Sequence, residues 1–125
     1  MTGFAAGAGP LLQLDRNDRK VIALLALAES AGDPITIPGA ALAQAMRDPA
    51  RQARLSRLLK QPRTTVVPLG SGDAIGVGQL LAASGTTDIA GAHVVICARR
   101  AHQSIVTSDP DDLHALDPRV NLIVL

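Results

Sequence analysis

The hydrophobic residues of this chain follow two spacings, and stretches with one spacing alternate with stretches of the other. Apolar residues three and four positions apart are typical of amphipathic helices, whereas short apolar runs bounded by Pro, Gly or polar residues are typical of buried strands. Helices are predicted over residues 15–30, 39–46, 49–60, 71–84 and 88–101, with a helical turn over 110–116. Strands are predicted over residues 34–38, 64–69, 103–109 and 119–125 and, from a weaker pattern, within 1–8.

The alternation of helices with short strands indicates the fold class. This order favours parallel strands whose two faces are both covered by helices. We therefore predict a three-layer α/β/α sandwich with a mostly parallel sheet, formed by one domain over residues 1–125. Ligands of such sheets bind beyond the carboxyl ends of the strands, and Asp109 falls at the end of a predicted strand.

Composition limits the chemistry that the chain offers. Its single aromatic residue, Phe4, leaves an aliphatic core and almost no platform on which unpaired bases stack. Its single cysteine, Cys97, excludes an internal disulfide and a zinc site with several cysteines, and its apolar surroundings predict a small core residue. The three histidines lack the spacing of a zinc site and are expected at the surface or half-buried; they are His93, His102 and His114.

Localisation is predicted from what the apolar runs lack. No run reaches the roughly 18 residues that span a bilayer, and the first residues lack the basic start and long apolar stretch of a signal peptide. The expectation is a soluble cytoplasmic protein with no membrane partner.

Basic residues gather in the middle of the chain. Six of the twelve Lys and Arg residues lie within residues 47–63, although the net charge is only +1. Five of them recur every three or four positions, which predicts a shared helical face: Arg47, Arg51, Arg54, Arg57 and Lys60. Such a row is either a solvated surface or an edge that contacts phosphates, and the second reading makes Arg51, Arg54 and Arg57 candidates for RNA binding.

Four segments carry a resemblance to a known family. They are "GAGPLLQLDRNDRK", "DPITIPGAALAQAMR", "GTTDIAGAHVVICARR" and "SIVTSDPDDLHAL", and together they resemble PIN domains, specifically the VapC-like toxins of actinobacteria. The resemblance covers essentially the whole chain. It implies a five-stranded parallel sheet, a ribonuclease that uses Mg²⁺ or Mn²⁺, a homodimer, and an antitoxin partner whose C-terminal segment occupies the acidic groove.

The acids on which the family's metal site depends are mostly replaced in this sequence. The resemblance places Gly7 at the family's first Asp, Gln44 at its Glu, and Gly91 at the Asp that opens the helix over 88–101. The fourth acid stands as Asp109, and Asp88 matches an additional acid of many relatives. Because a glycine supplies no ligand and a neutral amide is a weaker one, we predict weak metal binding and impaired ribonuclease activity.

Other interpretations stay open at this stage. Asp88 and Asp109 could form the metal site of a residually active endoribonuclease, with Asp112 completing it. Asp88 and Asp109 are also at positions suited to helix caps. Gln44 could be a polar group without a catalytic role. A non-catalytic module that binds RNA or an antitoxin, and a protein that only dimerises, are the remaining alternatives. Asp15 and Asp18 are expected to be helix caps or first-turn acids rather than site residues.

Overall fold

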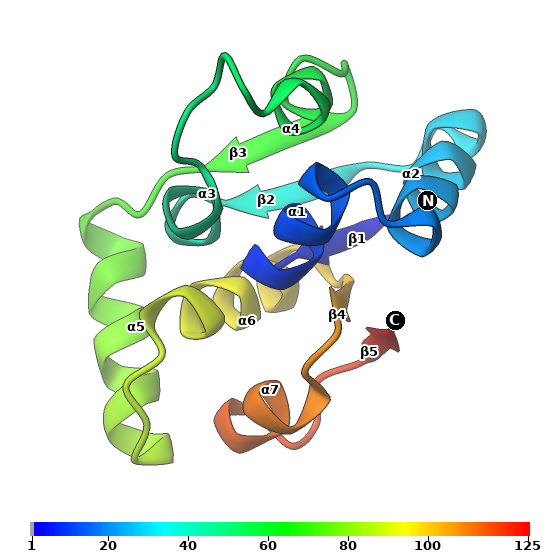
Figure 1. Ribbon diagram of the computed structural model, residues 1–125. Coiled ribbons are helices and arrows are strands. Elements are labelled where there is room, and N and C mark those ends of the chain that lie inside the picture. The colour runs from blue at the N-terminus through cyan, green and yellow to red at the C-terminus, as the bar shows by residue number, and fades with distance from the viewer. Residues whose placement is uncertain (1) are drawn as a thin grey trace.

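The central sheet consists of five short parallel strands. The computed structural model describes residues 2–125. Its strands are β1 (Phe4–Ala6), β2 (Ile35–Pro38), β3 (Thr64–Val67), β4 (Ser104–Thr107) and β5 (Leu122–Val124). They pair in the order β3-β2-β1-β4-β5, and every neighbouring pair is parallel (Figure 1). The prediction of a parallel sheet is therefore confirmed.

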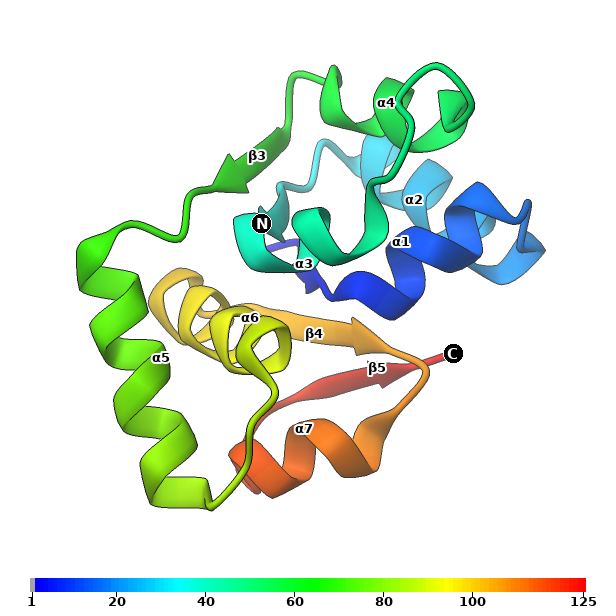
Figure 2. The same cartoon turned by 60° about the vertical axis from the view of Figure 1, so that its left-hand side comes forward.

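Helices cover both faces of the sheet, so the three-layer α/β/α prediction is also confirmed (Figure 2). Within residues 2–125 the helices are α1 (Ala8–Asp15), α2 (Arg19–Ala31), α3 (Gly39–Ala45), α4 (Ala53–Leu59), α5 (Ser71–Ser84), α6 (Ile89–Ala101) and α7 (Pro110–Leu116). One core forms under α1, α2 and α4, and a second core forms under α5, α6 and α7. Helix α3 contributes to both cores, through Ala45 to the first and Ala41 to the second.

The helix predicted over residues 15–30 is confirmed as α2, although α2 begins at Arg19 and ends at Ala31, and a separate helix, α1, precedes it. Helix α1 was not expected, since Gly9 and Pro10 suggest a turn, but proline is tolerated in the first turn of a helix. Asp15 ends α1, and Asn17 has a φ of 65°, which turns the chain between the helices. Asp18 is the cap of α2: its side chain accepts from two backbone N–H groups of the first turn.

Helix α4 is shorter than the prediction of residues 49–60, and Gln52 explains the difference. Its buried amide oxygen accepts from the backbone N–H groups of Arg47 and Asp48 at 2.7 and 2.9 Å. Its amide nitrogen donates to the carbonyl of Ala45 at 3.0 Å. These bonds hold residues 46–52 as a loop, so the basic row starts outside a helix.

The topology creates a crevice at the carboxyl ends of β1 and β4. These strands are neighbours, but the helix after β1 packs on one face of the sheet and the helix after β4 packs on the other. Such a point, where connections diverge to opposite faces, is where open α/β sheets bind ligands. Gly7 directly follows β1, and Ser108 and Asp109 directly follow β4.

Among the described residues, no single helix has the length and apolar composition needed to cross a membrane. Helices α5 and α6 meet that requirement only when taken together, and they bend by 110° at the break between them.

Candidate functional site

A pocket of about 260 Å³ lies at the carboxyl ends of β1 and β4. The structure brings six residues singled out in the sequence to its walls: Gly7, Gln44, Asp88, Gly91, Asp109 and Asp112. They come from the end of β1, from α3, from the start of α6 and from the start of α7. A wider hollow of about 450 Å³ shares three of these residues and continues past Leu116 of α7. The site is therefore an open groove with a deeper pocket.

Asp88 both caps α6 and faces this pocket. Its Oδ1 accepts from the backbone N–H of Gly91 at 2.9 Å, which is the bond expected of a helix cap. A Cβ placed on Gly91 would overlap the Asp88 carboxylate and would lie 3.1 Å from Cδ1 of Leu116. The Asp88 carboxylate thus occupies the space that a side chain at position 91 would need.

Asp109 precedes α7 but does not cap it. Its side chain makes no capping bond, while its backbone N–H donates to Oγ1 of Thr107 at 2.9 Å. A hydrogen-bonding interaction with Asp109, followed by the negative charge of Asp109, raises the pKa of Asp112. The charge of Asp88 acts in the same direction. The interpretation of Asp109 as a cap is therefore wrong, and its carboxyl belongs to the pocket.

The side of the pocket formed by β1 and α3 carries no carboxylate. A Cβ on Gly7 would meet only Cγ2 of Val94, at an ordinary contact distance of 3.7 Å, so this position has room for a side chain. Gln44 is exposed and supplies a neutral amide. The pocket has space for acids here, but the sequence does not provide them.

The acids that line the pocket do not fit a tightly held divalent cation. Within residues 2–125, one group of three His, Cys, Asp or Glu side chains has all its ligand atoms within 4.8 Å of one another, and that group lies outside the pocket. Asp88, Asp109 and Asp112 line the pocket without meeting this criterion together. Because Mg²⁺ demands several oxygen ligands in a near-ideal arrangement, this donor set suits it poorly.

Comparison with known proteins identifies the fold. No protein-family model matches the chain, and no curated protein sequence matches it. The chain is similar to a solved structure, that of VapBC2 from Rickettsia felis bound to a DNA fragment from their promoter. The match covers 98% of this chain and 98% of that chain, with a TM-score of 0.68 and 15% sequence identity. This chain has a VapC-like PIN fold. The expectation drawn from the four segments is confirmed at the level of the fold.

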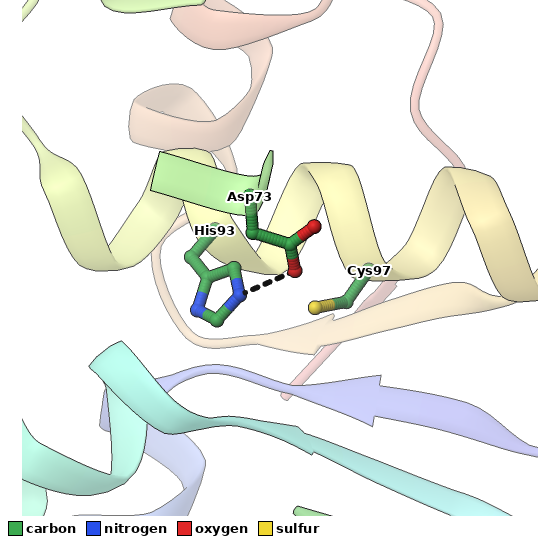
Figure 3. A group of neighbouring side chains, drawn as sticks. All are labelled: Asp73, His93 and Cys97. Atoms are coloured by element: carbon green, nitrogen blue, oxygen red, sulfur yellow. Dashed lines mark hydrogen bonds and ion pairs between the residues drawn. The ribbon is translucent and has the colours of Figure 1, made fainter. Parts of the chain in front are cut away.

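A polar cluster between α5 and α6 was not predicted (Figure 3). His93 of α6 is fully buried, so the expectation of a surface or half-buried position is wrong for this residue. Its Nε2 lies 3.1 Å from Oδ2 of Asp73 in α5, and its Nδ1 accepts from the backbone N–H of Ala40 at 3.4 Å. Arg100 donates to both oxygens of Asp73 at 2.9 to 3.1 Å. The sequence signal was the spacing of His93, Cys97 and Arg100, which places them on one side of α6.

Asp73, His93 and Cys97 form the group whose ligand atoms lie within 4.8 Å. Cys97 is buried as predicted, and burial, followed by the negative charge of Asp73, raises the pKa of its thiol to about 11. Hydrogen bonds already satisfy the other two side chains, and the guanidinium of Arg100 adds a positive charge beside them. Both features oppose a divalent cation, so the cluster reads as a structural feature of this PIN fold.

The three arginines proposed to bind RNA are all exposed, but they do not share one helical face. Arg51 lies in the loop before α4, where it pairs with Asp48 at 3.5 Å. Arg54 and Arg57 lie on α4 and border a second groove of about 260 Å³ between α1, α2 and α4. Apolar side chains form much of that groove, including Leu14, Ile22, Leu25 and Leu58.

Proposed function

We propose that this protein is a VapC-like PIN protein of the toxin–antitoxin type whose metal-dependent ribonuclease activity is impaired or absent. The composition of the pocket carries this proposal: Asp88, Asp109 and Asp112 remain on the α6 and α7 side, whereas Gly7 and Gln44 provide no carboxylate on the β1 and α3 side. A nuclease of this kind depends on a metal that activates water and offsets the charge of the scissile phosphate. Fewer acids mean a weaker hold on that metal.

Mg²⁺ or Mn²⁺ is the cofactor class that suits carboxylate oxygens, and we expect either ion to bind this pocket only weakly. Hard divalent ions gain affinity from the number of charged oxygens that reach them together. In the pocket, Gly91 contributes no side chain and its space is taken by the capping carboxylate of Asp88. At low pH Asp112 is a still weaker ligand, because its raised pKa keeps the carboxyl protonated up to a higher pH.

A residually active endoribonuclease is the second candidate function. Its support is that three carboxyl groups still line one pocket, with Asp88 and Asp109 in the catalytic roles and Asp112 beside them. A phosphate of the substrate would then supply the remaining ligands of the metal ion. This alternative and the leading proposal differ in one observable property, the cleavage of RNA by the unmodified protein.

The proposed partner is an antitoxin, and the protein is proposed to act in the cytoplasm. The similar Rickettsia felis structure is of VapBC2 on promoter DNA, and we extend from it the expectation of a VapB-like partner for this chain. The acidic groove favours a basic segment of such a partner. A non-catalytic binding module would keep this partner, or RNA held by Arg51, Arg54 and Arg57, without cleaving anything.

A homodimer is proposed through the outer face of α5. Ile75 on this face is 64% exposed, and Val66 and Leu69 in the preceding segment are also exposed apolar side chains. The one charged residue of α5, Asp73, points inward to Arg100. Two copies of this face can therefore meet without repulsion between like charges. An exposed apolar patch that lacks such repulsion is suited to self-association.

The test is cleavage of a mixed pool of structured RNAs in Mg²⁺ and in Mn²⁺. The proteins compared are the unmodified chain, Asp109→Asn, and a double variant, Gly7→Asp with Gln44→Glu, which adds acids where the pocket has room. We expect cleavage from the double variant and little or none from the unmodified chain. Cleavage by the unmodified chain that Asp109→Asn abolishes would establish the second candidate function and overturn the first.

A further inference from the structure

Helix α3 begins without a cap of its own. Pro38 precedes it and provides no side-chain bond to the first turn, so the free N–H groups of that turn need acceptors from elsewhere. One acceptor comes from α6: the backbone N–H of Ala40 donates to Nδ1 of His93 at 3.4 Å. His93 is fully buried, so water does not reach its Nδ1, and Ala40 is half-buried. The start of α3 is therefore held by a side chain 53 positions later in the chain.

The bond to Ala40 requires one tautomer of His93. A neutral imidazole accepts at one nitrogen only when the other nitrogen carries the proton. Nε2 lies 3.1 Å from Oδ2 of Asp73 (Figure 3). A carboxylate only accepts hydrogen bonds, so Nε2 must carry the proton to donate to it. Arg100 donates to both oxygens of Asp73 and so fixes the direction of the carboxylate. Asp73 and Arg100 thus favour the Nε2–H form, which leaves Nδ1 free to accept.

The chain of bonds ends one helical turn from the pocket. Ala40 and Gln44 are four positions apart on α3, and Gln44 lines the pocket. Asp73 also joins α5 to α6 through its bonds to His93 and Arg100, and among the described residues no other side-chain hydrogen bond joins α5 to another helix. We propose that His93 is a positioning residue that sets where α3 presents position 44 to the pocket, and that Asp73 and Arg100 hold His93 in the tautomer this requires. The functional part of this inference rests on the proposed function of the pocket.

The tautomer is measured directly in the unmodified protein, by the ¹⁵N chemical shifts of the His93 ring near pH 7. The inference requires the proton on Nε2. A proton on Nδ1, or a ring whose Nε2 binds added Zn²⁺ or Co²⁺ at stoichiometric amounts, would overturn it, because Nδ1 would then no longer accept from Ala40.

Two substitutions separate the two bonds of the ring. In His93→Asn the amide oxygen lies near the place of Nδ1 and still accepts from Ala40, whereas in His93→Gln the amide nitrogen lies near Nε2 and still donates to Asp73. We expect the amide hydrogen of Ala40 to exchange about tenfold faster in His93→Gln than in His93→Asn, which is the loss of one hydrogen bond. Equal exchange in the two variants would contradict the inference.

The effect on the pocket is tested in the Gly7→Asp, Gln44→Glu background. There we expect His93→Gln to weaken Mn²⁺ binding several-fold and His93→Asn to leave it nearly unchanged, because only the second variant keeps α3 in place. The reverse order would overturn the positioning role. A background protein that binds no Mn²⁺ would instead count against the proposed function, while the exchange of Ala40 would still decide the role of His93.

Discussion

At the scale of single residues, Gly91 is a glycine whose missing side chain matters. The Asp88 carboxylate lies where a Cβ at position 91 would be, and it accepts the N–H of Gly91 there. Alanine is normally the better helix residue by about 1 kcal/mol. We nevertheless expect Gly91→Ala to destabilise the protein by about 1 kcal/mol, because it displaces a helix cap. Urea unfolding measures the change.

Gly78 provides the matched control for this prediction. It also lies inside a helix, α5, but nothing lies within 4 Å of a Cβ placed there. Gly78→Ala should therefore stabilise the protein by about 0.5 to 1 kcal/mol. The account of Gly91 fails if the two substitutions shift the unfolding midpoint in the same direction.

Asp117 makes stability depend on pH. The backbone N–H of Arg119 and, after it, the guanidinium of Arg99 lower its pKa, with bonds of 2.9 Å and 2.8 to 3.1 Å. Since the folded pKa lies below the unfolded value, the stabilisation is complete above the unfolded pKa of about 4 and is lost as the pH falls through the folded pKa. Asp117→Asn should cost about 1 to 2 kcal/mol at pH 7 and reduce the loss of stability on acidification.

Unfolding midpoints measured from pH 7 to pH 2 test this prediction, with Asp111→Asn as a control that removes the same charge from an exposed side chain. The control should unfold like the parent at every pH. A parent-like pH dependence in Asp117→Asn would contradict the role given to Arg119 and Arg99.

Some residue-level features were predictable and others were not. Asp18 and Asp88 were recognised as caps because an acid before an apolar periodic run has one common explanation. His93 was placed wrongly because its partners, Ala40 and Asp73, lie 53 and 20 positions away. Spacing along one helix does not reveal which distant backbone group needs an acceptor.

At the scale of elements, α5 combines an exposed apolar side chain with the absence of an exposed charged one. Its outer face includes Ile75, which is 64% exposed, and its one charge is turned inward. We expect Ile75→Lys to weaken dimerisation at least about tenfold, because it places two like charges at a symmetric contact. Light scattering over a range of protein concentrations measures the effect.

Leu27 supplies the control for Ile75. It is 69% exposed, and its helix, α2, covers the opposite face of the sheet from α5. Leu27→Lys should leave the dimer intact. A parent protein that is monomeric at every concentration, or an equal effect of the two substitutions, would rule out the α5 interface.

Element boundaries were predictable where a local signal defines them. The start of α7 at Pro110 and the span of α5 follow from Pro and Gly positions, and both agree with the structure. The start of α4 did not follow, because the buried side chain of Gln52 holds the preceding loop through three backbone groups. Helix α1 was missed because the signals of Gly9 and Pro10 are the same for a turn and for a first helical turn.

At the scale of the whole molecule, the sequence predicted the fold class and the structure explains the pocket. Alternating helices and strands predict a parallel sheet. The connections after β1 and β4 go to opposite faces of that sheet, and this divergence brings positions 7, 44, 88 and 109 to one crevice. The strand order itself did not follow from periodicity, since each strand has only three or four residues. The resemblance supplied what the pattern could not.

The central claim is that the pocket has lost part of its hold on a divalent cation, and Mn²⁺ titration by calorimetry at pH 7 tests it most directly. The unmodified chain is compared with the Gly7→Asp, Gln44→Glu variant, whose thermal unfolding is checked first. The account predicts that the two added carboxylates tighten Mn²⁺ binding at least about tenfold. Equally tight binding by the unmodified chain would contradict it, because the pocket would then hold the metal with Asp88, Asp109 and Asp112 alone.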